Sequence, residues 1–198
     1  MGVEKRMADR CNTIRLYSFQ TDVVYQVLKR DGVCYSKEEY VRKKYKESAK
    51  VFINAYGWFV KEAQHIVPKP EGAEYPYWAF TDLYNVDQTG DGHVLTLDVP
   101  IGEAILFDMF DWTKIMQMHY IGENESEESA FSEELKNMGM NEFQIMTSNF
   151  YPEQKARIQE SWNRLFNHQQ AIEAGDNSGV HSVQAGLWCI KDEWIVKE

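Results

Sequence analysis

The run from His93 to Val99 restricts the fold more than any other part of the chain. Its side chains alternate, with Leu95, Leu97 and Val99 on one side of an extended backbone. A period of two is typical of a strand that buries one face. The residues just before it, 87–92, are rich in Asp and Gly, which favour turns. Part of the core is therefore expected to be a β-sheet.

Extended and helical patterns are mixed irregularly along the rest of the chain. Runs of β-formers predict further strands, at residues 13–20, 33–35, 77–80 and 103–107. Capping residues followed by apolar residues at helical spacing predict helices, beginning at Thr21 or Asp22, at Ser36, at Asp108 or Asp111 and at Tyr151. Because these elements do not alternate as βαβ units, we predict a single α+β domain with a mostly antiparallel, split sheet flanked by helices.

Two stretches allow more detailed predictions. Residues 36–66 have the pattern of a helix that starts with a capping box at Ser36 and breaks or bends at Gly57. Its inward side chains are expected to be Tyr40, Tyr45, Phe52, Tyr56, Phe59 and Val60. The closing stretch is expected to form two strands, 182–190 and 194–196, around a tight turn at 191–193.

Charge and hydropathy exclude several classes of protein. Among 198 residues, 21 Lys and Arg stand against 31 Asp and Glu, a net charge of −10, which disfavours nucleic-acid binding. No stretch approaches the ~20 apolar residues of a membrane span, the start lacks the apolar core of a signal peptide, and Arg6 does not fit the myristoylation pattern. We therefore expect a cytoplasmic protein without a lipid anchor. Residues 1–12 are predicted to fray, and the acidic residues 123–134 to form a mobile segment.

Motifs for metals and nucleotides are absent or incomplete. Three distant cysteines without a CxxC pair argue against zinc and disulfides. Residues 87–98 have the oxygen-ligand spacing of an EF-hand loop, but the last position is Asp98 within a strand pattern. We therefore predict a turn there, and no metal site. No GxGxxG, P-loop or catalytic histidine signature occurs.

Aromatic residues are unusually frequent, at 14% of the chain with 6 Trp and 11 Tyr. Such rings line ligand clefts as readily as they fill cores. For Tyr56 and Trp58, core packing is the simpler interpretation.

Segments spread over residues 14–196 resemble a bacterial and phage family, domain of unknown function 3841. They are Leu16 to Gln20, the helix to Val33, Ala55 to Trp58, Tyr75 to Trp78, Val94 to Pro100, Asp108 to Trp112, Ser161 to Phe166 and Val183 to Ala185. No activity comes with this resemblance.

The order of elements is also distantly similar to that of ADP-ribosyltransferases. This likeness implies a transferase acting on NAD, with Arg or His on the first strand, a central aromatic or Ser, and a late-strand Glu. Ser18 stands at the His position, Arg15 lies earlier on the strand, and Gly186 occupies the position of the Glu, with Gln184 two residues before. The carboxylate that would stabilise a developing positive charge is missing.

The resulting hypothesis is a degenerate ADP-ribosyltransferase-like domain that binds NAD, a related nucleotide or another polar small molecule in an aromatic cleft. The candidate ligand-binding residues are Arg15, Ser18, Gln20, Tyr56, Trp58, Trp78 and Gln184. Gln20 and Gln184 are expected on strands that could be neighbours, facing one cleft. The alternatives are a non-catalytic acidic domain that engages a basic protein partner, and an enzyme with unrecognised catalytic residues.

Overall fold

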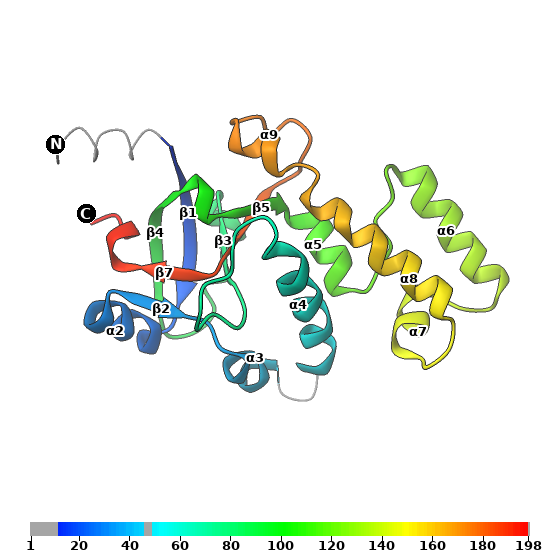
Figure 1. Ribbon diagram of the computed structural model, residues 1–198, viewed down its shortest axis with the longest axis horizontal. Helices are drawn as coiled ribbons and strands as arrows, with labels where there is room; N and C mark the ends of the chain where they lie inside the picture. The colour runs from blue at the N-terminus through cyan, green and yellow to red at the C-terminus, as the bar shows by residue number, and fades with distance from the viewer. Residues whose placement is uncertain (1–11, 46–48, 198) are drawn as a thin grey trace.

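Alternating side chains build a five-stranded antiparallel sheet in the computed structural model, which describes residues 12–45 and 49–197. Its strands run in the spatial order β4 (His93–Pro100), β1 (Thr13–Gln20), β3 (Tyr77–Phe80), β6 (Val183–Leu187) and β5 (Ile105–Asp108). A second, two-stranded sheet pairs β2 (Val33–Tyr35) with β7 (Cys189–Lys191). The predicted α+β domain with a split, antiparallel sheet is confirmed (Figure 1).

Helices surround this sheet. The α-helices are α2 (Asp22–Asp31), α3 (Glu38–Tyr45), α4 (Ala49–Ala63), α5 (Met109–Met116), α6 (Glu125–Asn137), α7 (Glu142–Thr147), α8 (Pro152–Ser161) and α9 (Gln169–Glu173). Short 3₁₀ helices are η2 (Leu83–Asn85), η3 (Ile101–Glu103), η4 (Trp162–Phe166) and η5 (Asp192–Trp194). In Figure 1 the helices α6, α7 and α8 extend away from the sheet and form what we call the helical lobe.

The sheet separates two apolar cores, because its side chains alternate between its faces. One core contains Leu16, Leu97 and Val99 from β1 and β4, with Leu28 of α2 and Ile190 of β7. The other lies under α4, α5 and the helical lobe, and its largest members are aromatic, among them Phe59, Phe107, Trp112 and Trp162. Most of the aromatic residues noted in the sequence therefore serve packing.

The predicted helix of residues 36–66 is present as two helices. Helix α3 begins at Glu38 rather than next to Ser36, because the Glu38 N–H donates to Glu74 Oε2 at 2.8 Å and Ser36 is bridged to Tyr75. Tyr40 is 46% exposed, so its expected inward position is wrong. The side chains of Tyr45 and Phe52 lie outside the described part of the structure.

The predicted closing hairpin is wrong. The chain leaves the large sheet at the end of β6, and after Trp188 it enters the small sheet as β7. Residues 192–194 then form η5 instead of a tight turn, and Ile195 makes an isolated bridge to Leu97 on β4. The buried Trp188 indole donates to the Val67 carbonyl at 2.7 Å, which fixes the point where the chain changes sheets.

The acidic residues of 123–134 lie mostly in a helix. Asn124 caps α6 by accepting from the Glu127 N–H at 3.0 Å, and Glu125, Glu127 and Glu128 occupy the first turn, where negative charge complements the helix dipole. Phe131 and Leu135 of the same helix are buried. Residues 1–11, the greater part of the segment expected to fray, lie outside the described residues. Among residues 12–45 and 49–197, no helix has the length and apolarity needed to cross a bilayer.

Candidate functional site

A groove of about 960 Å³ separates α4 from the helical lobe. One wall is the exposed side of α4, and the other is formed by the end of α7 and by α8. Clefts between separate parts of a fold are common ligand sites, and this volume suits a small molecule. The groove is therefore our candidate site.

Six residues of α4 line the groove, and four of them follow helical spacing. Asn54, Gly57, Trp58 and Lys61 are separated by three, one and three residues and all line the groove. Such residues share one side of a helix, while Tyr56 and Phe59 are buried on another side. Because the side of α4 that carries Tyr56 and Phe59 packs on the core, the side that carries Asn54, Trp58 and Lys61 faces the helical lobe.

Gly57 leaves the α4 backbone open in this wall. A glycine inside a helix costs roughly 1 kcal/mol relative to alanine, and α4 continues through it without the predicted break. A β-carbon at residue 57 would have no neighbour within 4 Å. Packing therefore does not require glycine there, and its visible effect is to widen the groove.

Both walls of the groove carry exposed polar side chains that have no partner in the described part of the fold. Within the described residues, no hydrogen bond or ion pair involves the side chains of Asn54, Gln159, Glu160 and Asn163, all of which line the groove. Three of these are amides, which both donate and accept. A molecule in the groove would meet free donors and acceptors from both walls.

Trp58 supplies an aromatic surface between these walls. Its ring lies 5.8 Å from that of Phe166 in a stacked arrangement and 5.4 Å, edge-on, from that of Trp162. These contacts fix the indole while leaving it partly exposed to the groove. The buried Met118 and Met146 complete the apolar part of the lining.

The charged residues of the groove balance each other. Lys61 is 2.8 Å from its neighbour Glu62, and Lys155 donates to the Ser148 carbonyl at the end of α7. With Glu160, two cations and two anions line the site. The groove therefore has no net charge with which to attract a polyanion.

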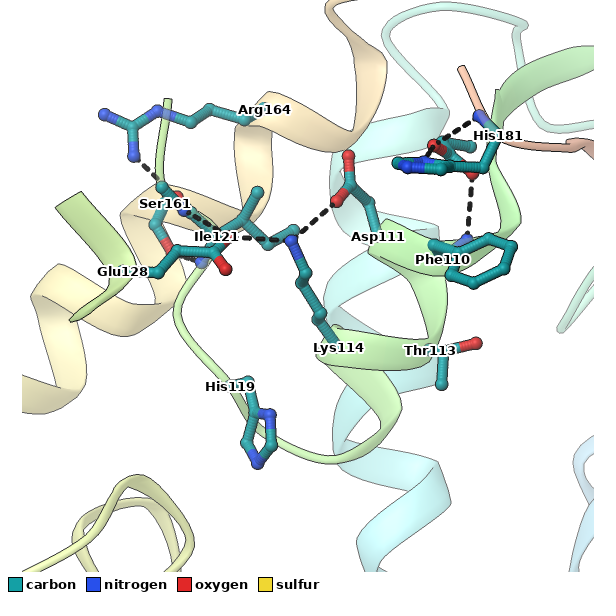
Figure 2. Close-up of polar contacts among 12 residues, drawn as sticks. Phe110, Asp111, Thr113, Lys114, His119, Ile121, Glu128, Ser161, Arg164 and His181 are labelled. Carbon is teal, nitrogen blue, oxygen red and sulfur yellow. Dashed lines mark hydrogen bonds and ion pairs between the residues drawn. The ribbon is translucent and has the colours of Figure 1, made fainter. Parts of the chain in front are cut away.

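A polar network holds the helical lobe against α5. Lys114 lies 2.6 Å from Glu128 of α6 and 3.4 Å from Asp111 (Figure 2). Burial raises the pKa of Asp111, and the nearby Lys114 only partly offsets this. In the connecting loop, the Ile121 N–H donates to Ser161 Oγ at 3.0 Å and Trp162 donates to the His119 carbonyl at 2.7 Å. These bonds join the helical lobe to α5 and to the loop that follows it.

Of the residues predicted from the sequence, only Trp58 lines the groove. Arg15 is exposed and pairs with Asp98 across β1 and β4 at 2.5 Å. Ser18 is fully buried and donates to the Trp78 carbonyl at 2.7 Å, and Gln20 donates to Ser18 Oγ at 2.8 Å. The Arg15 and Ser18 contacts tie β1 to its neighbours β4 and β3, and the Gln20 contact lies within β1.

Gln20 and Gln184 do not face one cleft. The β1 and β6 strands are separated by β3, and the register aligns Tyr17 with Phe80 and Phe80 with Gln184. Gln184 thus shares a face with Tyr17, and Gln20, three residues further along β1, lies on the other face. Gln184 Oε1 is buried and has no hydrogen-bond partner among the described residues.

Tyr56 and Trp78 belong to the aromatic core under α4. The Trp78 indole donates to Tyr56 Oη at 2.9 Å, and its ring meets those of Phe59 and Trp112 at 5.1 and 4.8 Å. Gly186 lies beneath this cluster, and a β-carbon there would be 2.8 Å from the Phe59 ring. No acidic side chain fits at the position of the expected carboxylate.

Sequence reasoning missed Asn54, Gly57, Lys61, Lys155, Glu160 and Asn163 as groove residues. The spacing of the α4 stripe is visible in the sequence, but polar residues on one side of a helix ordinarily face solvent. Only the position of α8 reveals that the stripe has an opposite wall. Across residues 12–45 and 49–197, no group of three or more His, Cys, Asp or Glu could hold a metal ion.

Comparison with known proteins identifies a family. A family model described as "Domain of unknown function (DUF3841)" matches residues 15–196. No curated protein and no solved structure matches the chain.

Proposed function

The chain belongs to the DUF3841 family, and we propose that it binds a nucleotide or a similar polar small molecule in the groove between α4 and α8. The ligand would place a flat ring near Trp58 and hydrogen-bonding groups near the amides of both walls. The function is therefore ligand binding, at a site away from the cleft suggested by the strand order.

The observation that carries this proposal is the set of unpartnered side chains around one fixed indole. Exposed polar side chains are free to bond water or a ligand, whereas buried polar groups normally have partners within the fold. Here Asn54, Gln159 and Asn163 have none within the described residues, yet they face the same groove as Trp58. A base or nicotinamide ring with a ribose presents a flat surface and several donors and acceptors, which match this lining.

The charge balance of the groove narrows the ligand class. The lining contains Lys61, Lys155, Glu62 and Glu160, so its net charge is zero. A strongly charged phosphate chain is therefore not attracted electrostatically to the groove as a whole. A nucleoside or a nucleotide with few phosphates therefore fits better than a triphosphate, and NAD fits through its nucleoside parts.

Our proposal does not include ADP-ribosyl transfer. The ring of Phe59 fills the space beside Gly186, so the late-strand carboxylate of ADP-ribosyltransferases has no counterpart at that position. The ADP-ribosyltransferase-like order of elements stays a prediction, as do the cytoplasmic location and the bacterial or phage origin.

Thermal unfolding in the presence of adenosine, AMP, ADP-ribose, NAD and ATP tests the proposal. A ligand that binds only the native state stabilises it by about 2.7 kcal/mol at one hundred times its dissociation constant. We expect a higher melting temperature with adenosine, AMP or NAD than with ATP. An unchanged melting temperature with every compound would contradict the proposal.

The variant Gly57→Leu shows whether a shift comes from the groove. Nothing within 4 Å opposes a side chain at residue 57, so the variant should fold while its leucine fills part of the groove. The matched control is Gly102→Leu, because a β-carbon there is equally free and residue 102 does not line the groove. Stabilisation should vanish in Gly57→Leu and persist in the control, and equal stabilisation of both variants would place binding elsewhere.

A further inference from the structure

Asp108 holds a buried carboxylate at the junction of β5 and α5. Its Oδ1 accepts from the Phe110 N–H at 3.0 Å, and its Oδ2 accepts from the His181 N–H at 3.0 Å. Burial by itself would raise the pKa of this carboxyl group, but the N–H donors of His181 and Phe110 outweigh it and lower the pKa. Asp108 is therefore a fixed negative charge.

The same carboxylate orients the imidazole of His181. Nδ1 of the ring lies 2.9 Å from Asp108 Oδ2, and the ring packs on Phe110 with 4.9 Å between centroids (Figure 2). A carboxylate can only accept, so Nδ1 carries the proton and the lone pair lies on Nε2. The His181 side chain is 75% exposed while that of Asp108 is 5% exposed. The basic nitrogen thus faces solvent and the orienting charge is shielded from it.

We propose that His181 is a nucleophilic histidine that accepts a phosphoryl group on Nε2. In the step, the Nε2 lone pair forms a bond to phosphorus while the bond from phosphorus to its leaving group breaks and the leaving group keeps that electron pair. The Nδ1 proton stays in place, so the phosphorylated ring is positively charged. Asp108 offsets this charge, which stabilises the transition state that leads to it.

The surroundings of His181 leave its ring accessible to a phosphoryl donor. The ring packs against Phe110 in the first turn of α5, whose N-terminus is already capped by Asp108. His181 is not part of the groove lining, and its ring is reached directly from solvent. These features describe a site of modification by an incoming phosphoryl donor, separate from the ligand groove.

His93 offers a matched comparison within the chain. It also contacts an aspartate and an aromatic ring, with Nε2 2.6 Å from Asp22 Oδ1 and 4.5 Å between its centroid and that of Tyr25. The Asp22 side chain, however, is 69% exposed, so solvent screens its electrostatic attraction to the His93 imidazole. His93 should therefore react much more slowly than His181.

The test is reaction with phosphoramidate, whose nitrogen–phosphorus bond breaks to release ammonia. We expect acid-labile, base-stable phosphate on the peptide that contains His181, lost in His181→Gln and kept in His93→Gln. Asp108→Asn should react about tenfold more slowly, the effect of losing one charge-assisted hydrogen bond in the transition state. Equal reactivity of His181 and His93, or phosphate only on other residues, would overturn the proposal.

A second measurement does not depend on the folding of Asp108→Asn. The ¹⁵N chemical shifts of the His181 ring in the unsubstituted protein report which nitrogen carries the proton. We expect a protonated Nδ1 and an unprotonated Nε2 in the neutral ring. The opposite tautomer would place the lone pair toward Asp108 and would also overturn the proposal.

Discussion

The ring of Phe59 lies 2.8 Å from the point where a β-carbon on Gly186 would stand. Phe59 belongs to α4 and Gly186 to β6, so this contact sets how closely the helix approaches the sheet. The same contact keeps any larger side chain out of that part of the late strand. Helix α4, which forms one wall of the groove, therefore packs directly against Gly186 in the sheet.

Replacing Gly186 by alanine should therefore destabilise the fold. The added methyl group would push against a fully buried phenyl ring, and overpacking of this kind costs about 1–3 kcal/mol. Denaturant unfolding measures the loss, with Gly102→Ala as the control because nothing lies within 4 Å of a β-carbon there. A Gly186→Ala variant as stable as the control would show that α4 moves freely.

Gln169 protects the open edge of β5. Its buried amide accepts from the Leu106 N–H and donates to the Ala104 carbonyl at 3.2 Å. In Gln169→Leu these backbone groups lose their partner, and we expect a loss of about 1–3 kcal/mol in unfolding free energy. The exposed neighbour Gln170 supplies the control Gln170→Leu. Similar stabilities for both variants would mean that water satisfies the edge.

Asp108 and Asp111 should give opposite contributions to acid stability. Burial tends to raise the pKa of Asp108, but its hydrogen bonds lower it overall. Its stabilisation is therefore complete above the ordinary pKa of the carboxyl group and is lost as pH falls through the lowered value. Burial raises the pKa of Asp111, so the native state binds that proton more readily and gains stability as pH falls through the raised value.

Variants of the two aspartates check these signs. We expect Asp108→Asn to lose about 1–3 kcal/mol at neutral pH and to show a weaker decline in unfolding free energy from pH 7 to pH 3. Asp111→Asn should show a steeper decline over the same range. A parallel pH profile for both variants would contradict the assignment.

Gly57→Ala should stabilise the protein. Alanine is favoured over glycine within a helix by roughly 0.5–1 kcal/mol, and residue 57 has space for a methyl group. Thermal unfolding should show the gain while nucleotide binding remains, because a methyl group fills little of the groove. Destabilisation would mean that residue 57 has a packing role in the fold.

Local patterns in the sequence were sufficient for most elements of the sheet. Alternation predicted β1 and β4, and of the two predicted caps, Asp108 and Asp111, Asp108 is the one that begins α5. The closing hairpin failed because the change of sheets at Trp188 depends on a contact with Val67, far away in sequence. Strand pairing between distant segments has no local signature, since it is decided by which faces become buried.

The candidate site was harder to predict than the fold. Aromatic residues drew attention to Trp58, which lines the groove, but also to Tyr56 and Trp78, because a buried ring and a ligand-binding ring look alike in a sequence. The amides of Asn54 and Asn163 resemble ordinary surface residues until the two helices are placed opposite each other. A site formed between two elements depends on how those elements pack in space. The periodicity of apolar residues along the sequence does not specify that packing.

The most direct test of the ligand groove is the ¹⁵N–¹H signal of the Trp58 indole during titration with AMP, adenosine and NAD. Trp58→Phe identifies this signal, and the buried Trp194, which belongs to the other core, serves as the internal control. Our proposal predicts a saturable shift of the Trp58 signal with at least one of these compounds and an unchanged Trp194 signal. A Trp58 signal that stays constant at saturating concentrations of all three would contradict it.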